Sequence, residues 1–478
     1  MRILALIILA GAVHRLLFLG RPQLWTDELM QAFAGRPSSF AEVLDRVTAG
    51  LSVPAPLDIF VQNGVVTLLG ESNFALRLHA AVFGILSIWI FFRIADTLFG
   101  RRVALYSTCL FAFFPLQYRY SQEGQPYALL LFLTLLSYDL LLKKVLGRDG
   151  GWPDWLYLGV LLTLILYTSL LGFLVVISQV LGLVLLRRPP TPDQGIAGPG
   201  GGTPDLPGPR TAVLLGYALA ALVAICLFVP WLRFAWSSPV PAEHSEIADP
   251  WLVLRIVREL GGHSYVVSAL LLAGAAAGFR ALRLHGRRRT RYWLLAWLLP
   301  SLPLLLIVQY WSGYFFSIRQ VLHVTPALVL LAGYGLSYVG ERMRILDRLP
   351  YQFSAPAIAY AALLVAASLW IGARHWSKEH ADWRGTAQFL ADTIRPGDAL
   401  VIPEVYNLLE YYQPVLRGPL VPSLDAGALD APGGGPERRI VVCYDWLRPD
   451  PCADFRPVAM ADDAWQRQER RGFTIFLR

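Results

Sequence analysis

The sequence predicts a polytopic α-helical membrane protein that ends in a small α/β domain. The 478 residues are 55% hydrophobic and only 16% charged. The mean hydropathy of +0.48 is too high for a soluble chain of this length. Apolar stretches that can cross a bilayer recur up to residue 373, whereas short strand patterns appear only beyond it. We therefore expect a transmembrane domain at 1–373 and a soluble domain at 374–478.

About eleven transmembrane helices are expected, because one span needs roughly 20 apolar residues. They lie near residues 3–19, 76–98, 103–118, 126–142, 153–169, 171–186, 211–230, 264–282, 292–309, 319–339 and 354–373. The short pair at 153–186 can also form one kinked hairpin. The first segment resembles a signal peptide, but Arg21-Pro22-Gln23 follows it in place of a small-residue cleavage site, so a retained helix is expected.

Basic residues predict the orientation of these spans. With a cytoplasmic N-terminus every basic cluster falls on the cytoplasmic side, as the positive-inside rule requires. The clusters are Arg101-Arg102, Lys143-Lys144 with Arg148, Arg187-Arg188, Arg283 with Arg287-Arg288-Arg289 and Arg291, and Arg342 with Arg344 and Arg348. The net charge of +8 therefore needs no nucleic-acid partner. The segments expected outside are the loops at about 20–75, 119–125 and 231–263 and the tail at 374–478.

Two of these outer segments have predicted structure of their own. In the first loop, Ser38 or Ser39 can cap an interfacial helix with apolar residues at helical spacing, and 57–69 can form a second one. In the tail, a helix is expected at 382–394 and strands at 399–402, 439–444 and 473–477. Cys443 and Cys452 can form a disulfide if the tail is outside the cytoplasm, but the sequence alone does not show the pairing.

Two adjacent carboxylates, Asp27 and Glu28, stand just past the first predicted span. A carboxylate at a partly dry interface has a raised pKa, which suits a general base that removes a proton from a hydroxyl. Its neighbour then positions the base or binds a cation. The alternative is an interfacial cap, because acidic residues also favour the first turn of a helix.

Two arginines lie where a charge is costly. Arg15, within the first predicted span, either contacts a lipid phosphate or snorkels to the interface. Arg319 opens the tenth span on the outer side, against the positive-inside trend. We expect it to pair with a phosphate or with a carboxylate of an outer loop, either for function or as a structural ion pair.

The short outer loop from Arg119 to Tyr127 concentrates hydrogen-bonding groups in a tight turn. It is either a binding loop or a capped helical hairpin with Pro126 in the first turn. The loop at 231–263 carries His244, Glu246, Asp249 and His263, whose spacing matches no standard zinc signature. No cofactor is therefore certain, and a divalent cation stays optional.

The order of these motifs resembles the GT-C glycosyltransferases, in particular the bacterial branch of the dolichyl-phosphate-mannose protein mannosyltransferase family, which includes the aminoarabinose transferases. The resemblance covers nearly the whole chain and is strongest over 15–130. The matching elements are Arg15, Trp25-Thr26-Asp27-Glu28, the segments 75–84, 118–129 and 319–332, and the tail opening Asp382-Trp383-Arg384.

The resemblance implies an inverting transfer of a monosaccharide from a polyprenyl-phosphate carrier to a lipid, glycan or protein acceptor at the outer face of a bacterial cytoplasmic membrane. Asp27 is the expected base, with Glu28 assigned to catalysis beside it. The side chains expected to bind the donor are Arg15, Tyr120, Gln122, Glu123, Tyr127 and Arg319. Asp58 is expected on the acceptor side.

The chain also departs from the family pattern. His-Pro-Pro-Leu-Tyr is replaced by Pro54-Ala55-Pro56-Leu57-Asp58, the Arg of Glu-Ala-Arg-Pro-Tyr by Gln125, and Tyr-Thr-His-Tyr by the segment 167–170. These changes leave open a non-catalytic scaffold in envelope glycan assembly. A lipid-glycan flippase or other transporter is a further alternative, although the chain lacks the internal repeat that transporters commonly show.

Overall fold

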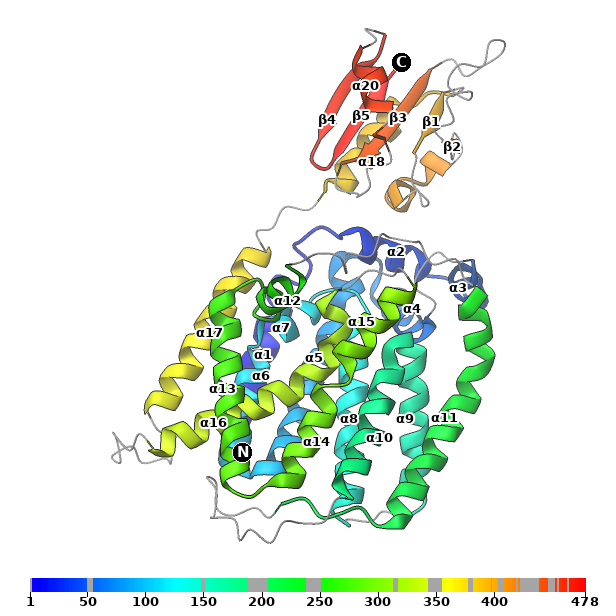
Figure 1. Ribbon diagram of the computed structural model, residues 1–478. Coiled ribbons are helices and arrows are strands. Elements are labelled where there is room, and N and C mark those ends of the chain that lie inside the picture. Colours follow the sequence, from blue (N-terminus) through cyan, green and yellow to red (C-terminus); the bar gives the residue numbers. More distant parts are fainter. Residues whose placement is uncertain are drawn as a thin grey trace.

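The computed structural model describes most of the chain (Figure 1). The described residues are 2–49, 55–147, 151–187, 205–237, 251–312, 317–342, 355–376, 381–396, 398–402, 408–417, 420–421, 438–445, 452–453, 455–461 and 464–478.

A bundle of helices makes up the larger part of the structure. Its helices are α1 (Arg2–Leu16), α5 (Asn73–Phe99), α6 (Arg101–Ala112), α7 (Pro115–Tyr120), α8 (Tyr127–Val145), α9 (Pro153–Thr168), α10 (Phe173–Leu186), α11 (Thr211–Ser237), α12 (Leu252–Leu260), α13 (Tyr265–Leu284), α14 (Arg288–Leu298), α15 (Ser301–Ser312), α16 (Thr325–Arg342) and α17 (Ala355–Trp376). Each of the eleven predicted segments contains helix. Pro115 and Pro300 divide two of them, because proline removes a backbone donor and disfavours a helical residue before it.

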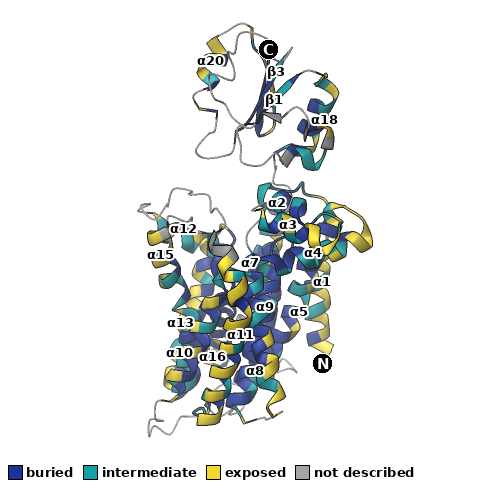
Figure 2. Ribbon diagram, turned by 90° about the vertical axis from the view of Figure 1, so that its right-hand side faces the viewer, coloured by how far each residue is buried: buried dark blue, intermediate teal, exposed yellow. Residues whose placement is uncertain are grey.

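Five helical segments among the described residues are long and apolar enough to cross a membrane: Asn73–Phe99, Thr211–Arg233, Tyr265–Leu284, Arg288–Val308 and Ile318–Arg342. Shorter apolar helices accompany them, so the count of about eleven spans stays a prediction. Leucines on the outward sides of α1 and α11 are more than half exposed, which leaves an apolar exterior that water does not solvate well (Figure 2). The chain is a multi-pass membrane protein.

Close packing of α13 against α16 depends on glycine. A Cβ atom on Gly278 would overlap the carbonyl oxygen of Leu331, and one on Gly335 would overlap the carbonyl oxygen of Gly274. Small residues at such a crossing let two membrane helices approach closely. This contact fixes α16, which follows directly on the 3-10 turn Ile318–Val324 that carries Arg319.

The first outer loop folds into three short helices, α2 (Thr26–Ala34), α3 (Phe40–Thr48) and α4 (Pro56–Leu69). Ser39 caps α3, as expected, by accepting a hydrogen bond from the backbone N–H of Glu42 at 3.4 Å. The residues expected on the apolar face of α3 differ in their burial, however. Val43 and Val47 are fully buried, whereas Phe40 is 67% exposed and stacks on Phe60 with 4.3 Å between ring centroids.

The C-terminal part is a five-stranded sheet with helices around it. The elements are α18 (Trp383–Thr393), β1 (Ala399–Val401), β2 (Leu420–Val421), β3 (Arg439–Tyr444), α20 (Phe455–Ala461), β4 (Gln466–Arg470) and β5 (Phe473–Leu477). The strand order is β2-β1-β3-β5-β4, with β1 parallel to β2 and β3 and with β5 antiparallel to β3 and β4. Strands occur at the three predicted positions. The two edge strands were not predicted: β2 has only two residues, and β4 is polar and mostly exposed, so it lacks the apolar pattern of β1, β3 and β5.

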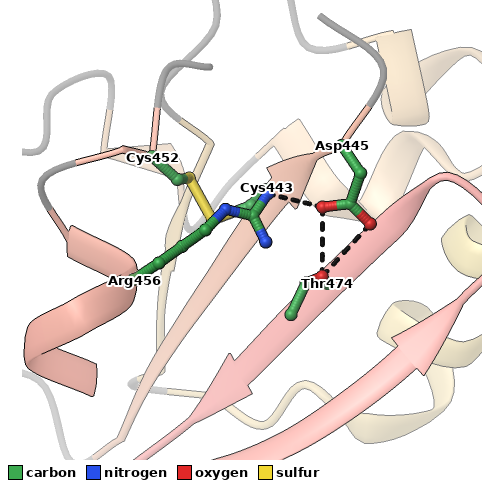
Figure 3. The surroundings of a disulfide bond; sticks show 5 residues. All are labelled: Cys443, Asp445, Cys452, Arg456 and Thr474. Atoms are coloured by element: carbon green, nitrogen blue, oxygen red, sulfur yellow. Dashed lines mark hydrogen bonds and ion pairs between the residues drawn. A yellow bond between two sulfur atoms is a disulfide. The ribbon is translucent and has the colours of Figure 1, made fainter. Parts of the chain in front are cut away.

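A disulfide joins Cys443 at the end of β3 to Cys452, with 5.9 Å between the two Cα atoms. Beside it, Asp445 accepts hydrogen bonds from Arg456 at 2.5 Å and from Thr474 at 3.0 Å (Figure 3). These contacts tie α20 to the sheet.

The outer loop and the C-terminal sheet share one hydrophobic cluster. It includes Leu24, Leu29, Val66 and Leu76 from the membrane part together with Trp383, Leu400, Leu409, Leu416 and Ile475 from the C-terminal part. Polar contacts add to it: Arg36 donates to the carbonyl oxygen of Tyr411 at 2.6 Å, and the hydroxyls of Thr26 and Tyr444 are 3.2 Å apart. The first outer loop and the C-terminal part both lie at the end of the bundle opposite the N-terminus (Figure 1).

Candidate active site

The first turn of α2 directs the two adjacent carboxylates to different partners. Consecutive residues on a helix are about 100° apart, so Asp27 and Glu28 cannot share one face. The backbone N–H of Trp25 donates to Glu28 Oε2 at 3.4 Å, which begins the helix at Thr26. One carboxylate therefore meets Arg319, whereas the other meets Arg77.

Asp27 forms an ion pair with Arg319, with 2.5 Å between Oδ2 and Nη1. The side chains keep 32% and 11% of their surface exposed, so the pair is partly accessible. The Arg319 guanidinium lies 5.0 Å from the ring centroid of Trp25 and 5.6 Å from that of Tyr127. Gln125 donates to the backbone oxygen of Asp27 at 2.8 Å and fixes the start of α2. The expected pairing of Arg319 with an outer-loop carboxylate is found.

The surroundings of Asp27 favour a basic carboxylate. Burial raises its pKa above the usual value, and the nearby charges of Glu123 and Glu28 raise it further. The guanidinium of Arg319 acts in the opposite direction. Any ligand that takes Arg319 away from Asp27 therefore makes this carboxylate a stronger base.

Glu28 is 1% exposed and both of its oxygens have protein donors. Arg77 donates to Oε1 at 2.7 Å and to Oε2 at 2.6 Å, and the backbone N–H of Gly124 donates to Oε1 at 2.7 Å. Arg77 also donates to the carbonyl oxygens of Leu19, Pro22 and Gln23. Glu28 thus joins the first outer loop to the short loop, which is a positioning geometry. The catalytic role assigned to it stays a prediction.

The short loop carries several of the residues predicted to bind the sugar donor, but their side chains have different neighbours. Gln122 donates to the carbonyl oxygens of Arg15 at 2.9 Å and Leu17 at 3.0 Å, so it caps the end of α1. Tyr120 is buried and contacts the Tyr127 ring edge-on at 5.4 Å. Tyr127 borders Arg319, as described above. The two tyrosines therefore lie beside the ion pair of Asp27, whereas Gln122 is turned to the end of α1.

Glu123 is 3% exposed and accepts a hydrogen bond from Arg119 Nε at 2.9 Å through Oε1. Its other oxygen, Oε2, is buried and has no hydrogen-bond partner within the described part of the chain. A buried carboxylate oxygen in this state is an acceptor for a ligand hydroxyl or a cation.

Arg15 is 1% exposed inside the helix bundle. It donates to the carbonyl oxygens of Ala112 at 2.7 Å and Gly11 at 3.2 Å and to the hydroxyl of Ser121 at 3.3 Å. The side chain therefore does not snorkel. Its donors are directed to protein oxygens, which supports the helix packing below the short loop.

Asp58 is likewise 1% exposed, between α2, α4 and α5. Its Oδ2 accepts from Gln31 Nε2 at 2.6 Å and lies 3.2 Å from His79 Nε2. Direct contact with an acceptor is therefore not available to Asp58 in this conformation, and its predicted acceptor-side role remains untested.

Metal ligands do not gather in the described residues: no three His, Cys, Asp or Glu side chains there are placed to hold an ion. His244, Glu246 and Asp249 lie outside the described residues. His263 contacts Arg119, with 3.1 Å between Nε2 and Nη1.

Three residues of this site were missed in the sequence: Arg77, Arg119 and Gln125. Arg77 lies inside a predicted span, where a charge needs a partner, and that signal points to a nearby carboxylate. Arg119 precedes Glu123 by four residues, which is the spacing of an ion pair on one helical turn. Nothing in the sequence indicates that the Gln125 amide reaches the backbone of Asp27.

Comparison with known proteins agrees with this architecture. Residues 53–192 match the family described as dolichyl-phosphate-mannose-protein mannosyltransferase. No curated protein matches the chain in sequence. Crystal structures of ArnT from Cupriavidus metallidurans are similar at 13% identity over 99% of this chain and 97% of theirs. The TM-score is 0.63 for the apo state and 0.61 for the complex with undecaprenyl phosphate.

A second class of similar structures is the oligosaccharyltransferase of Archaeoglobus fulgidus, in complex with zinc and sulfate. It is 10% identical, with a TM-score of 0.56, over 92% of this chain and 67% of that one. This chain therefore shares its fold with ArnT and with the archaeal oligosaccharyltransferase. The resemblance predicted from the motifs is confirmed by the family match within residues 53–192 and by the fold.

Proposed function

We propose that this protein is an inverting glycosyltransferase that moves a monosaccharide from a polyprenyl-phosphate carrier to an acceptor at the outer face of the cytoplasmic membrane. The ion pair between Asp27 and Arg319 carries the proposal, because it places a base and a phosphate-binding cation 2.5 Å apart. The GT-C fold supports it. So does the complex of the similar ArnT structure with undecaprenyl phosphate.

Arrival of the donor exchanges the partner of Arg319. The phosphodiester of the lipid-linked sugar carries one negative charge, as a carboxylate does, and offers the guanidinium two free oxygens; it gains a second negative charge as the bond to the anomeric carbon breaks. Once Arg319 turns to the phosphate, Asp27 loses the charge that lowers its pKa. The base is thus activated only when the donor is in place.

Transfer then follows by direct displacement. The acceptor hydroxyl forms a bond to the anomeric carbon from the face opposite the phosphate, and its proton goes to Asp27 Oδ2. The bond between the anomeric carbon and the phosphate oxygen breaks, and its electron pair leaves with polyprenyl phosphate. One displacement inverts the anomeric configuration.

Arg319 stabilises the charge that develops on the leaving phosphate. Preorganised electrostatics of this kind is usually the largest catalytic contribution. Trp25 and Tyr127 border the guanidinium and limit its movement. The Oε2 atom of Glu123 can accept a hydrogen bond from a hydroxyl of the sugar. Tyr120 packs edge-on against the Tyr127 ring and holds it in place.

The outward orientation of the site is part of the proposal. A disulfide joins Cys443 and Cys452, and disulfides persist in oxidising compartments outside the cytoplasm. The domain that carries it shares a hydrophobic cluster with the first outer loop, which holds Asp27. Loop and tail therefore lie on the same side, and the basic clusters predict that the opposite side is cytoplasmic.

Purified protein supplied with undecaprenyl-phosphate-linked mannose, glucose, arabinose and aminoarabinose tests the proposal. Release of undecaprenyl phosphate in the presence of an envelope extract as acceptor is the readout. Asp27→Asn is expected to lower turnover about 10²–10⁴-fold, as for loss of a general base. Asp45→Asn, an exposed acid of the same outer loop, is the matched control. Equal turnover of wild type and Asp27→Asn would remove Asp27 from the mechanism, and a wild type that releases no lipid phosphate would favour a scaffold or flippase.

A further inference from the structure

A cavity lies where the C-terminal part meets the membrane part. Its volume is about 360 Å³, within the range of small-molecule sites. The membrane part contributes the end of the first outer loop and the start of α5, and the C-terminal part contributes α18 and the segment 411–413. The lining residues are Glu71, Ser72, Asn73, Leu76, Arg384, Gln388, Tyr411, Tyr412 and Gln413.

The polar groups of this cavity are arranged by regular structure. Arg384 and Gln388 are four residues apart on α18, so they lie on one exposed face of the helix. Gln413 donates to Gln388 Oε1 at 2.6 Å, which orients both amides. Tyr411 and Tyr412 meet edge-on, with 5.1 Å between ring centroids. The cavity therefore offers amides, a guanidinium and aromatic rings side by side.

The lining excludes two ligand classes. Among the described residues that border the cavity, Leu76 is the single aliphatic one, so a prenyl or acyl chain meets little apolar wall there. Arg384 and Glu71 bring one positive and one negative charge to the lining, so a free phosphate or another anion finds no net positive charge there. The lining fits a ligand with hydroxyl groups, which both donate and accept hydrogen bonds. It also fits a ring whose C–H face can lie against a tyrosine. That is the chemistry of a neutral sugar.

The cavity adjoins the candidate active site through one layer of side chains. Leu76 borders the cavity, and the next residue, Arg77, forms the buried ion pair with Glu28. Tyr412 lies within electrostatic range of both Glu28 and Arg77. Glu28 in turn directly follows Asp27 on α2. Asp27 is directed to Arg319 and away from Glu28, so a chain of sugars held in the cavity has to extend past the buried Glu28–Arg77 pair to bring its end to the reaction centre.

We propose that this cavity is a subsite for a glycan acceptor and that it binds a sugar residue away from the hydroxyl that reacts. The inference rests on the proposed glycosyltransferase function and narrows its acceptor from lipid, glycan or protein to a glycan. Arg36 supports the subsite from the membrane part, because it donates to the carbonyl oxygen of Tyr411 and stacks on its ring at 4.8 Å. The subsite exists only where the two parts of the chain meet.

Binding of oligosaccharides to the full-length protein in nanodiscs tests the subsite. Fluorescently labelled protein is applied, without any donor lipid, to an array of bacterial surface oligosaccharides, and binding of the retained glycans is measured by calorimetry. The double variant Arg384→Gln/Gln388→Ala is expected to weaken binding at least tenfold. Gln388→Trp, which fills the cavity, is expected to abolish binding. Gln468→Ala, an exposed glutamine on β4 of the same domain, is the matched control.

The outcomes separate this inference from the transfer reaction. Wild-type protein that binds no glycan at millimolar concentration, or variants that bind as tightly as wild type, would overturn the subsite. Because no donor is present, neither result depends on turnover. Glycan binding that is lost in the cavity variants, combined with full turnover of Asp27→Asn, would instead keep the subsite and reject the proposed mechanism.

Discussion

Glu28 and Arg77 form a two-pronged ion pair with N···O distances of 2.7 and 2.6 Å, and the two side chains are 1% and 3% exposed. The pair links α2 to α5 at the point where the outer loop, the short loop and the C-terminal part come together. Removal of one partner is expected to lower the free energy of unfolding strongly, because a buried charge without its partner is costly.

Glu28→Ala is expected to destabilise the protein by about 3–5 kcal/mol, since Arg77 stays buried without its carboxylate. Thermal unfolding in detergent measures the effect. The double variant Glu28→Ala/Arg77→Met should recover a large part of the loss, because it removes the isolated charge. A single variant as stable as wild type would show that the pair does not hold the loops.

The pH dependence of turnover is expected to report Asp27. Only the deprotonated carboxylate accepts a proton, so activity falls as pH decreases through its pKa. Because burial raises that pKa above the ordinary value of 3.8, the acid limb is expected at a higher pH than for an exposed aspartate. In kcat/KM, which reports the free enzyme, the residual activity of Arg319→Gln should show this limb at higher pH, since the guanidinium that lowers the pKa of Asp27 is gone. Arg21→Gln, an exposed arginine of the same loop, should leave the limb in place.

Two glycines are expected to respond in opposite directions to alanine. Gly278→Ala should lower the unfolding temperature and the turnover, because its Cβ collides with α16, on which Arg319 depends. Gly64→Ala, in the middle of α4 with open space around it, should be stabilising by roughly 0.5–1 kcal/mol through helix propensity. If both variants lowered stability equally, the close crossing of α13 and α16 would not explain why glycine occupies position 278.

The disulfide is expected to be formed in protein isolated under oxidising conditions. Denatured, non-reduced protein should then show two thiols that react with maleimide, Cys109 and Cys226, and reduced protein should show four. Cys443→Ser/Cys452→Ser should lower the stability of the C-terminal part by about 3 kcal/mol in the chain-entropy account of a short loop. Four reactive thiols without reduction would contradict both the bond and the proposed outer location.

The sequence predicted the elements that depend on local patterns. Helical segments followed from apolar length, and the three apolar strands followed from their composition. The partner of Arg319 was predictable as an outer-loop carboxylate, because an outward-facing arginine at a span's end needs an anion. Contacts between distant segments were not predictable in this way. The contact of Arg15 with the carbonyl oxygen of Ala112 was not predictable, because that oxygen comes from another helix; its predicted contact with a lipid phosphate stays a prediction.

Buried carboxylates were the hardest to interpret from the sequence. Asp58 resembled an acceptor contact because it replaces a tyrosine in the family pattern, yet Gln31 and His79 enclose it. Asp27 and Glu28 were indistinguishable by position, and only the rotation of α2 between them separates the accessible base from the enclosed partner. The polar edge strand β4 was missed because exposure on an edge leaves no apolar alternation.

The shared cluster of Leu24, Leu29, Val66 and Leu76 with Trp383 and its neighbours has a consequence for truncation of the chain. Cutting the chain after α17 would leave these leucines facing water rather than lipid, on a surface that no bilayer covers. Such a truncated protein should aggregate through its outer face even though its membrane helices are intact. The tail is thus an integral part of the folded protein, and the two parts have to be expressed together.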